Sequence, residues 1–222
     1  IESEDILPIG VGEGSWPDFK KIFHQDDVNF KDELGGTIKV GINYKNWYNN
    51  SSSRYNSWYH PFEFKNSHKN IKSADYTFES WMDNIDEHED YAFHFDASKF
   101  IKTYKDKCIN EWGINYINSK VEDCTIDDVG NIESLLLSNG ETQSAEFFID
   151  CTGFKRTLIS NLNTEIIDLS DELLCDRALA THIEGENKNH IYWTTATALS
   201  SGWSWNIPLQ NNTGTGYVYS SK

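Results

Sequence analysis

Residues 202–221 read GWSWNIPLQNNTGTGYVYSS, and this stretch decides the predicted fold. Two apolar-rich runs, 203–209 and 215–221, flank a polar segment of Gln, Asn, Thr and Gly, which is typical of a β-hairpin. Trp203 and Trp205 stand two positions apart, so a strand directs both indoles to one face. The pair predicts a single aromatic wall, which either packs in a core or lines a binding site.

A second strand signal lies at residues 37–45, TIKVGINYK, where apolar and polar residues alternate without a break. We expect one continuous strand here. Its two faces are predicted to carry Ile38, Val40, Ile42 and Tyr44 on one side, and Thr37, Lys39, Gly41, Asn43 and Lys45 on the other.

Two helices are predicted from their end signals and apolar spacing. The first spans 18–25, where Pro17 suits the first helical position. The second spans 97–112, with Asp96 as a good N-cap and Gly113 as a stop signal. Its buried stripe is predicted to consist of Phe100, Ile101, Tyr104, Cys108 and Trp112.

The chain after the second helix reads as strands joined by short turns. These strands are expected at 114–118, 121–126, 131–138 and 145–150. Asn139-Gly140 is a strong hairpin signal, and the polar stretches 49–53 and 184–190 are expected to be loops. This order of elements predicts an α/β fold with mixed parallel and antiparallel sheets.

The charge balance disfavours some classes of partner. The 222 residues contain 19 Lys+Arg and 35 Asp+Glu, a formal net charge of −16, which repels nucleic acid backbones and anionic membranes. No apolar run approaches the ~20 residues of a membrane span, and the opening IESEDILPIG has no signal-peptide features. The four cysteines have neither zinc-site spacing nor the density of a disulfide scaffold. We therefore expect a cytoplasmic protein that binds no nucleic acid, membrane or metal.

Three motifs combine glycines or aromatic rings in ways that suit a ligand. Residues 10–17, GVGEGSWP, precede the first helix, and residues 150–154, DCTGF, follow an apolar strand. Glycines let a backbone approach a ligand closely, and the carboxyl end of a strand is where α/β sheets bind nucleotides. Taken alone, each of these motifs fits an ordinary tight turn equally well. The third motif is the tryptophan pair in residues 202–208.

Together, GVGEGSWP, DCTGF and GWSWNIP resemble the flavin-dependent halogenases of the tryptophan halogenase type. The order of segments agrees over nearly the whole chain, including YAFHFDASKF at 91–100 and TGTGYVYSS at 213–221. The pattern W-x-W-x-I-P is the most specific part of the resemblance. The resemblance implies a flavoprotein monooxygenase-like FAD-binding fold, of which residues 1–222 would be the central part of a single domain. The family's Gly-rich pyrophosphate loop, its Pro-Leu-Glu-Ser segment with the catalytic glutamate and its helical C-terminal part have no counterpart in these residues.

The resemblance implies a reaction that uses FAD as FADH2, O2 and a halide ion. A separate flavin reductase would supply the FADH2, and the halide would become hypohalous acid that travels to a lysine beside a small, electron-rich aromatic substrate. The family's lysine lies a few residues before an Asn-Trp pair, here Asn46-Trp47, so Lys39 matches the catalytic position. By its alternation alone Lys39 would instead face solvent, and Lys45 is a second candidate on the same predicted strand face.

The other site residues implied by the resemblance form two groups. Those expected to bind the cofactor are Glu2, Gly10, Val11, Gly12, Glu13, Gly14, Asp150, Thr152, Gly153 and Phe154. Those expected to border the substrate or the tunnel are Trp16, Pro17, His60, Pro61, Phe62, Trp203, Trp205, Ile207 and Pro208. Residues 10–17 would form a strap between the flavin and the tunnel, and Glu2 would bond the adenosine ribose. His60 is either a general base or a structural histidine, and a homodimer is left open.

Three alternatives stay open. A flavin-dependent aromatic hydroxylase shares much of the resemblance, although Lys39 and the tryptophan motif argue against it. A non-enzymatic carbohydrate-binding module would also use many Trp and Tyr rings. An inactive fragment that keeps only the fold pattern is the third alternative. Halide-dependent product formation separates the halogenase from the hydroxylase, and flavin absorbance would count against the carbohydrate-binding module.

Overall fold

The computed structural model describes residues 1–6, 10, 12–47, 57–62, 91–186 and 191–222. They form two compact units, one made of Ile1–Leu7 and Lys107–Leu169, the other of Pro8–Asp106 and Ser170–Lys222. Helices occur together with parallel and antiparallel strand pairs, which confirms the predicted mixed α/β class. That residues 1–222 belong to one single domain stays a prediction.

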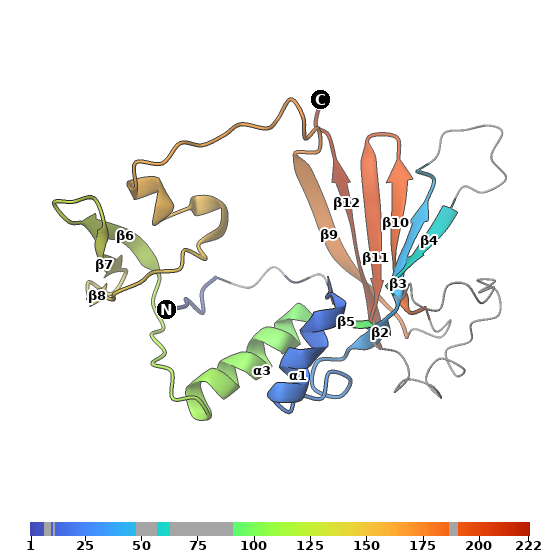
Figure 1. Cartoon of the computed structure of the whole chain (residues 1–222), viewed down its shortest axis with the longest axis horizontal. Coiled ribbons are helices and arrows are strands. Elements are labelled where there is room, and N and C mark those ends of the chain that lie inside the picture. Colours follow the sequence, from blue (N-terminus) through green and yellow to red (C-terminus); the bar gives the residue numbers. More distant parts are fainter. Residues whose placement is uncertain (7–9, 11, 48–56, 63–90, 187–190) are drawn as a thin grey trace. The chain divides into compact units, whose positions relative to one another are not determined.

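A six-stranded sheet organises the larger unit (Figure 1). Its spatial order is β4-β3-β10-β11-β12-β9, in which β3 and β10 run parallel and all other neighbours antiparallel. The strands are β3 (Gly41–Lys45), β4 (Ser57–Pro61), β9 (Arg177–Glu184), β10 (Trp193–Leu199), β11 (Gly202–Pro208) and β12 (Asn212–Tyr219). The pair β11–β12 confirms the predicted C-terminal hairpin, whereas β4, β9 and β10 have no counterpart in the sequence prediction.

The prediction of one continuous strand at 37–45 is wrong, because the structure divides it at Val40. The first part is β2 (Thr37–Lys39), which belongs to a three-stranded antiparallel sheet of order β1-β5-β2 with β1 (Glu13–Gly14) and β5 (Ala92–Phe95). The second part is β3, in the six-stranded sheet. The amide of Val40 donates to the Tyr192 carbonyl at 2.8 Å, outside both ladders. Lys39 and Lys45 therefore do not share a strand face.

Aromatic side chains form the core on one face of the three-stranded sheet. The buried cluster consists of Phe23, Val28, Leu34, Phe93 and Phe95. Phe23 belongs to α1 (Lys20–Gln25), which follows a 3-10 turn at Pro17–Phe19, so the predicted helix at 18–25 is confirmed. Phe100 and Tyr104 of α3 (Ala97–Asn110) pack against the same cluster, and Figure 1 shows α1 and α3 side by side.

The ends of α3 are set by the predicted residues. Asp96 Oδ1 accepts hydrogen bonds from the backbone amides of Ser98 (2.8 Å) and Lys99 (3.1 Å), which otherwise lack a helical partner. Gly113 follows the helix with a φ of 66°, which suits its predicted role as a stop. Trp112 departs from the predicted buried stripe, because it lies beyond the last helical residue and is 50% exposed.

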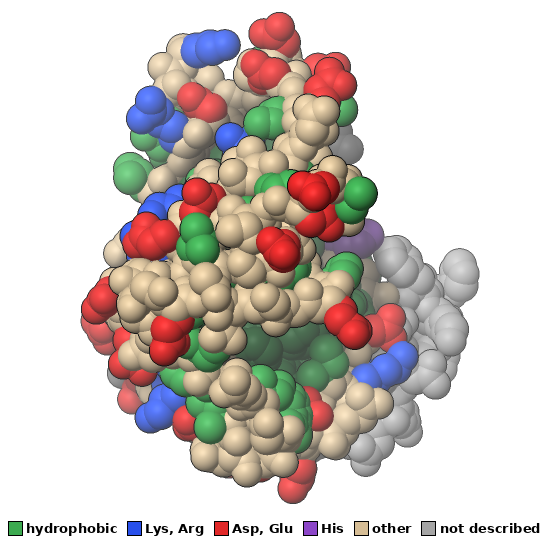
Figure 2. All heavy atoms as spheres, turned by 90° about the vertical axis from the view of Figure 1, so that its left-hand side faces the viewer, with side chains coloured by type: hydrophobic (Ala, Val, Ile, Leu, Met, Phe, Trp, Pro, Cys, Tyr) green, Lys and Arg blue, Asp and Glu red, His purple; other side chains and the backbone are tan. Residues whose placement is uncertain are grey.

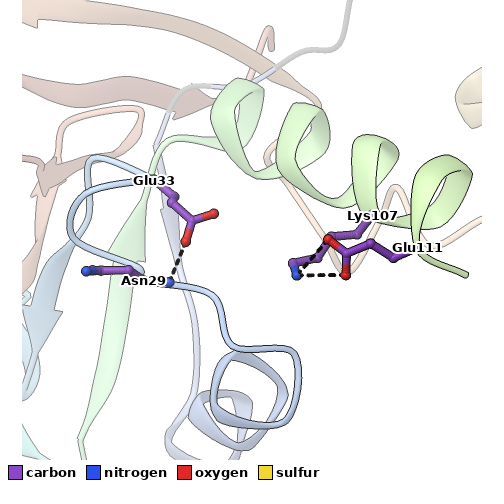
Figure 3. A network of polar contacts seen from close by, with 4 residues as sticks. All are labelled: Asn29, Glu33, Lys107 and Glu111. Carbon is purple, nitrogen blue, oxygen red and sulfur yellow. Dashed lines mark hydrogen bonds and ion pairs between the residues drawn. The ribbon is translucent and has the colours of Figure 1, made fainter.

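Two local polar contacts of these helices and loops are drawn in Figure 3. Glu33 Oε1 accepts a hydrogen bond of 2.8 Å from the backbone amide of Asn29, which closes the loop that leads to β2. Lys107 and Glu111 form an ion pair of 3.1 Å over one helical turn at the end of α3. Such pairs add little to stability individually, so the aromatic core is the larger source of order here.

The smaller unit contains an antiparallel sheet of β6 (Val121–Ile126), β7 (Ile132–Leu137) and β8 (Thr142–Ser144). It confirms the first two predicted strands of the meander and the Asn139-Gly140 turn, where Gly140 has a φ of 86°. The predicted strands at 145–150 and 114–118 are wrong. Neither segment joins a ladder, apart from one bridge of Asn118 to Glu2. Alternation alone does not make a strand, since its backbone groups also need a partner.

Acidic side chains are spread over the face shown in Figure 2, in line with the net charge of −16. Among the helices in the described part of the chain, none combines the length and apolar character needed to cross a membrane.

We expect Asp96→Ala to lower the free energy of unfolding by about 1 kcal/mol, because two backbone amides of α3 lose their acceptor. Urea denaturation followed by circular dichroism measures the change. Asp106→Ala is the matched control: it removes the same charge from the exposed side of the same helix. An equal loss in both variants would show that charge, and not capping, stabilises the helix.

Candidate active site

Lys39 is buried in the larger unit, with 7% of its surface exposed. Its Nζ donates a hydrogen bond of 3.1 Å to the backbone carbonyl of Ser15 and lies 5.2 Å from the centre of the Phe62 ring. The alternative that Lys39 faces solvent is therefore wrong. Lys45, the second candidate, is exposed at the end of β3.

Burial changes the acid-base chemistry of Lys39. It lowers the pKa of the ammonium group to about 8, because the surroundings solvate the charge poorly. Within the described residues, no carboxylate forms an ion pair with Lys39 to offset this cost. Lys39 is thus a buried cation whose neutral form is accessible just above neutral pH.

The strap, residues 10–17, is held beside Lys39 by hydrogen bonds to β5. The Ser15 amide donates to the Phe93 carbonyl at 2.8 Å, and the Phe93 amide donates to Ser15 Oγ at 2.9 Å. Gly14 leaves room for the ammonium group, since a Cβ at Gly14 would lie 3.0 Å from Lys39 Nζ. Val11, an expected cofactor residue of the strap, lies outside the described residues.

Gly12 brings the strap onto the six-stranded sheet. It is buried with a φ of 82°, and a Cβ there would lie 3.4 Å from both Ile207 Cγ2 and Gly214 Cα. The neighbouring Pro208 carbonyl accepts a hydrogen bond of 2.6 Å from Thr37 Oγ1 on β2. The structure thus places two predicted residues, Gly14 and Phe62, beside Lys39. It brings Gly12 against Ile207, and it joins Pro208 to the strand that carries Lys39.

The predicted tryptophan wall is present on the sheet face that carries Ile207. Trp203 and Trp205 share this face, with ring centroids 6.0 Å apart, and the Trp205 ring lies over Gly216, where a Cβ would not fit. Trp47 joins the wall through a centroid distance of 6.5 Å to Trp203. Whether the wall borders a tunnel stays a prediction.

The remaining residues expected at the substrate side differ in exposure. His60 of β4 is exposed and stands opposite Ile42 in the ladder, and Pro61 stands opposite Gly41. Trp16 is 60% exposed and packs edge-on against Phe19, at a centroid distance of 4.9 Å, while Pro17 begins the 3-10 turn. Their roles at the substrate stay predictions.

His94 and Thr194 are site residues that the sequence prediction missed. His94, on β5, is fully buried; its Nε2 lies 3.0 Å from Thr194 Oγ1 and its Nδ1 lies 3.2 Å from Thr37 Oγ1. Burial, and then the charge of Lys39, hold the pKa of His94 well below its usual range. A signal was available in the sequence: a histidine alternates with phenylalanines in AFHF, within a fully buried strand.

The expected cofactor residues after position 149 belong to the smaller unit, where Asp150 organises its own loop. Asp150 Oδ1 accepts from the amide and hydroxyl of Thr152, and Oδ2 from the amides of Leu158 and Ile159. Although desolvation raises the pKa of Asp150, these hydrogen bonds, led by the Thr152 hydroxyl, lower it to about 2. The carboxylate is engaged by this loop, which assigns it a structural role there.

The backbone that follows Asp150 is open. Gly153 has a φ of 63° and nothing within 4 Å of the position that a Cβ would take, and the Phe154 side chain is fully exposed. Glu2, also in this unit, bonds through its backbone to Ile117 and Ser119, at 3.1 Å each. That Glu2 and residues 150–154 bind the same cofactor as the strap stays a prediction.

The profile of the family described as tryptophan halogenase matches residues 1–90 and 77–222. The chain belongs to the tryptophan halogenase family. It is 29% identical to the tryptophan 7-halogenase RebH of Lentzea aerocolonigenes over 265 aligned positions, which cover 100% of this chain and 50% of RebH. It is 25% identical to the tryptophan 6-halogenase ThaL of Streptomyces albogriseolus, with coverages of 99% and 50%.

Solved structures of this family share the fold. The tryptophan halogenase from Shewanella frigidimarina superposes with a TM-score of 0.80 at 28% identity, over 99% of this chain and 48% of that one. Xcc4156, a flavin-dependent halogenase from Xanthomonas campestris, gives 0.80 at 26% identity, with coverages of 99% and 49%. The chain thus spans about half the length of the relatives that it matches. These matches give no support to the carbohydrate-binding alternative.

In the described part of the chain, no group of three or more His, Cys, Asp or Glu side chains is placed to hold a metal ion.

We expect the Lys39 amine to become reactive as the pH rises through about 8, because only the neutral amine is a nucleophile. Trace labelling with a small acylating reagent, quantified by mass spectrometry of the Lys39 peptide, measures the midpoint. The lowered pKa also makes the free energy of unfolding depend on pH. In the unfolded state the pKa of Lys39 is near 10.5, so between about pH 8 and 10.5 the unfolded chain binds more protons than the folded one. The free energy of unfolding therefore rises with pH across this window. A labelling midpoint near 10.5 would contradict the burial of this ammonium group.

Proposed function

We propose that the native gene product containing residues 1–222 halogenates an electron-rich aromatic compound, with Lys39 as the catalytic residue. The overall reaction consumes FADH2, O2, halide, one proton and the arene, and yields FAD, the aryl halide and two waters. The observation that carries the proposal is the buried ammonium of Lys39, which is hydrogen-bonded to the strap and has no carboxylate ion-pair partner among the described residues. Membership of the tryptophan halogenase family supports the same reaction class.

Within each unit, residues are present that fit a flavin. The strap offers the exposed backbone of Glu13 and Gly14, and in the smaller unit Gly153 and Phe154 offer an open surface for a planar ring. FAD, when bound in its reduced form FADH2, would supply the two electrons that activate O2 and so allow halide to be oxidised. Asp150 contributes indirectly, because it shapes the loop in which Thr152 and Gly153 lie.

Lys39 acts on hypohalous acid, HOX, and its two protonation states offer two modes. The ammonium group donates a hydrogen bond that polarises the O–X bond. The ring carbon then bonds X, the O–X bond breaks, and the released hydroxide leaves as water with the ring's proton. Alternatively, the neutral amine takes X as a haloamine and releases water, and transfer of X to the ring restores the amine. A pKa of about 8 keeps both forms accessible.

The surroundings of Lys39 suit a reactive oxidant and a planar substrate. Phe62 and the strap limit access of water to Nζ, which protects HOX from loss. Tyr44 and Trp58 stack at a centroid distance of 4.6 Å beside the tryptophan wall, so this part of the chain is rich in aromatic surface. We therefore propose a small aromatic substrate, without committing to an indole, a phenol or a pyrrole.

We expect Lys39→Ala to lower halogenation by about 10²-fold or more, since one hydrogen-bond donor to the reacting group is lost. Chromatography with mass spectrometry measures the aryl halide formed from FADH2, O2 and halide. The variant should fold, because the desolvated ammonium costs stability in the wild type. Lys39→Arg should not restore activity, because a guanidinium group is bulkier, has a diffuse charge and cannot become a haloamine.

Lys45→Ala is the matched control for this experiment, because it makes the same charge change at an exposed position six residues away. An equal loss in Lys45→Ala, or product from Lys39→Ala at the wild-type rate, would remove Lys39 from the mechanism. A hydroxylated product that forms without halide would favour the aromatic hydroxylase instead.

We also propose that FAD is the cofactor and that a separate flavin reductase reduces it, as the resemblance to the flavin-dependent halogenases implies. Equilibrium dialysis of the native gene product against FAD should show saturable binding, with weaker binding after Gly12→Val, which forces a branched side chain into a buried, positive-φ position. Halogenation with NADPH alone at the rate reached with a reductase would contradict the need for that partner.

A further inference from the structure

We propose that His94 is a positioning residue for Lys39: as a neutral imidazole with a fixed tautomer, it forms the floor over which the lysine reaches the strap. This inference rests on the proposed function, because it takes Lys39 as the catalytic residue.

The hydrogen bonds of Thr37 determine the tautomer of His94. Thr37 Oγ1 lies 2.6 Å from the Pro208 carbonyl, which can only accept, so the single hydroxyl hydrogen of Thr37 points there. Thr37 Oγ1 must therefore accept from His94 Nδ1 at 3.2 Å, and Nδ1 carries the hydrogen. In the neutral ring Nε2 is then an acceptor, and it receives the hydroxyl hydrogen of Thr194 at 3.0 Å.

The strand register places this imidazole on the face of the sheet that the lysine side chain crosses, two positions along β5 from Ala92, which stands opposite Lys39. In the sheet β1-β5-β2, His94 stands opposite Thr37 on one side and Gly14 on the other. Thr37, Lys39 and His94 share one face, because they occupy alternate or opposite positions. Lys39 belongs to β2, but its Nζ bonds Ser15 on the far side of β5. Its side chain must therefore cross β5 on the face that carries His94.

Lys39, Thr194 and His94 all have side-chain atoms near the position that a Cβ on Gly14 would take. A Cβ on Gly14 would lie 3.0 Å from Lys39 Nζ, 3.4 Å from Thr194 Oγ1 and 3.5 Å from His94 Cδ2. The edge of the ring that holds Cδ2 and Nε2 therefore lies toward Gly14, the residue beside which Lys39 Nζ also lies, and the Nδ1 edge faces Thr37.

The neutral state of His94 suits a floor beneath a cation. A second positive charge, on His94, in the same buried site would repel the ammonium group of Lys39. Burial and the charge of Lys39 both keep the ring neutral, in agreement with the acceptor role of Nε2. The Thr194 hydroxyl, held by Nε2, then presents its lone pairs, not its hydrogen, to its remaining neighbours.

A purely structural role is the competing explanation, because His94 links β5 to β2 and to β10. The two roles differ in how far they couple the oxidation of FADH2 to halogenation of the arene. A structural defect lowers the amount of folded protein but leaves each folded molecule as efficient as before. A misplaced lysine lets the flavin be oxidised without halogenating the arene.

The test compares variants of the native gene product in single turnovers, with enzyme in excess over FADH2. The measured quantity is aryl halide formed per FADH2 oxidised, with the KM for the arene determined separately. His94→Leu removes both ring hydrogen bonds, and His94→Gln can return an acceptor to the place of Nε2. Thr194→Val removes the hydroxyl without changing the shape of β10, and Thr194→Ser restores it. Thr195→Val, on the opposite face of β10, is the matched control.

We expect the product ratio to fall about fivefold to tenfold in His94→Leu and Thr194→Val, the size of one hydrogen bond, with KM within about twofold of wild type. His94→Gln and Thr194→Ser should recover most of the ratio. If His94→Leu does not fold, the Thr194 pair carries the test alone. Wild-type ratios in Thr194→Val, or losses in yield and melting temperature with an unchanged ratio, would overturn the inference.

Lys39→Ala in the same assay separates this inference from the proposed function. A wild-type product ratio in Lys39→Ala would overturn both, because no catalytic lysine would remain to be positioned. Loss of product in Lys39→Ala together with full coupling in His94→Leu and Thr194→Val would overturn only the role of His94.

Discussion

The hydrogen bond from Lys39 Nζ to the Ser15 carbonyl is the contact on which the rest of the site depends. A buried ammonium group with a backbone carbonyl as acceptor, and no carboxylate beside it among the described residues, remains a strong donor with a lowered pKa. A salt bridge would have stabilised the charge and raised that pKa. The arrangement costs stability and leaves the lysine chemically available, as is common at functional sites.

This contact requires the break in the chain at Val40. If residues 37–45 formed one strand, Lys39 would lie in the same sheet as Lys45 and could not cross β5 to the strap. The change of sheet at Val40 lets β2 pair with β5 while β3 pairs with β10. It also places Thr37 where it bonds both His94 and the Pro208 carbonyl. The strand that carries Trp203 and Trp205 ends at Pro208, and the hydrogen bond from Thr37 to the Pro208 carbonyl joins it to β2, the strand of Lys39.

The strap and the loop after Asp150 show two uses of glycine-rich motifs. In the strap, glycine suits position 12 because of its positive φ of 82°, and it suits position 14 because Lys39 Nζ approaches closely there. After Asp150, the carboxylate binds four donors of its own loop, and Gly153 keeps an open backbone surface. The first motif shapes the surroundings of the lysine, whereas the second presents backbone outward. Both are compatible with a planar cofactor, through different physical means.

The sequence by itself determined the family, the mixed α/β class, the hairpin of β11 and β12, the capped helix α3 and Lys39 as the candidate residue. The hairpin and the helix follow from local signals, namely alternation, turn residues and capping residues, whereas the family and Lys39 follow from the resemblance of the motifs to those of the halogenases. Only the tertiary structure decided that residues 37–45 divide between two sheets, that 145–150 forms no ladder, and that His94 and Thr194 join the site. The physical reason is that strand pairing and the burial of Lys39 depend on partners far apart in the chain, such as Ser15 and Thr194, and alternation within one segment carries no information about them.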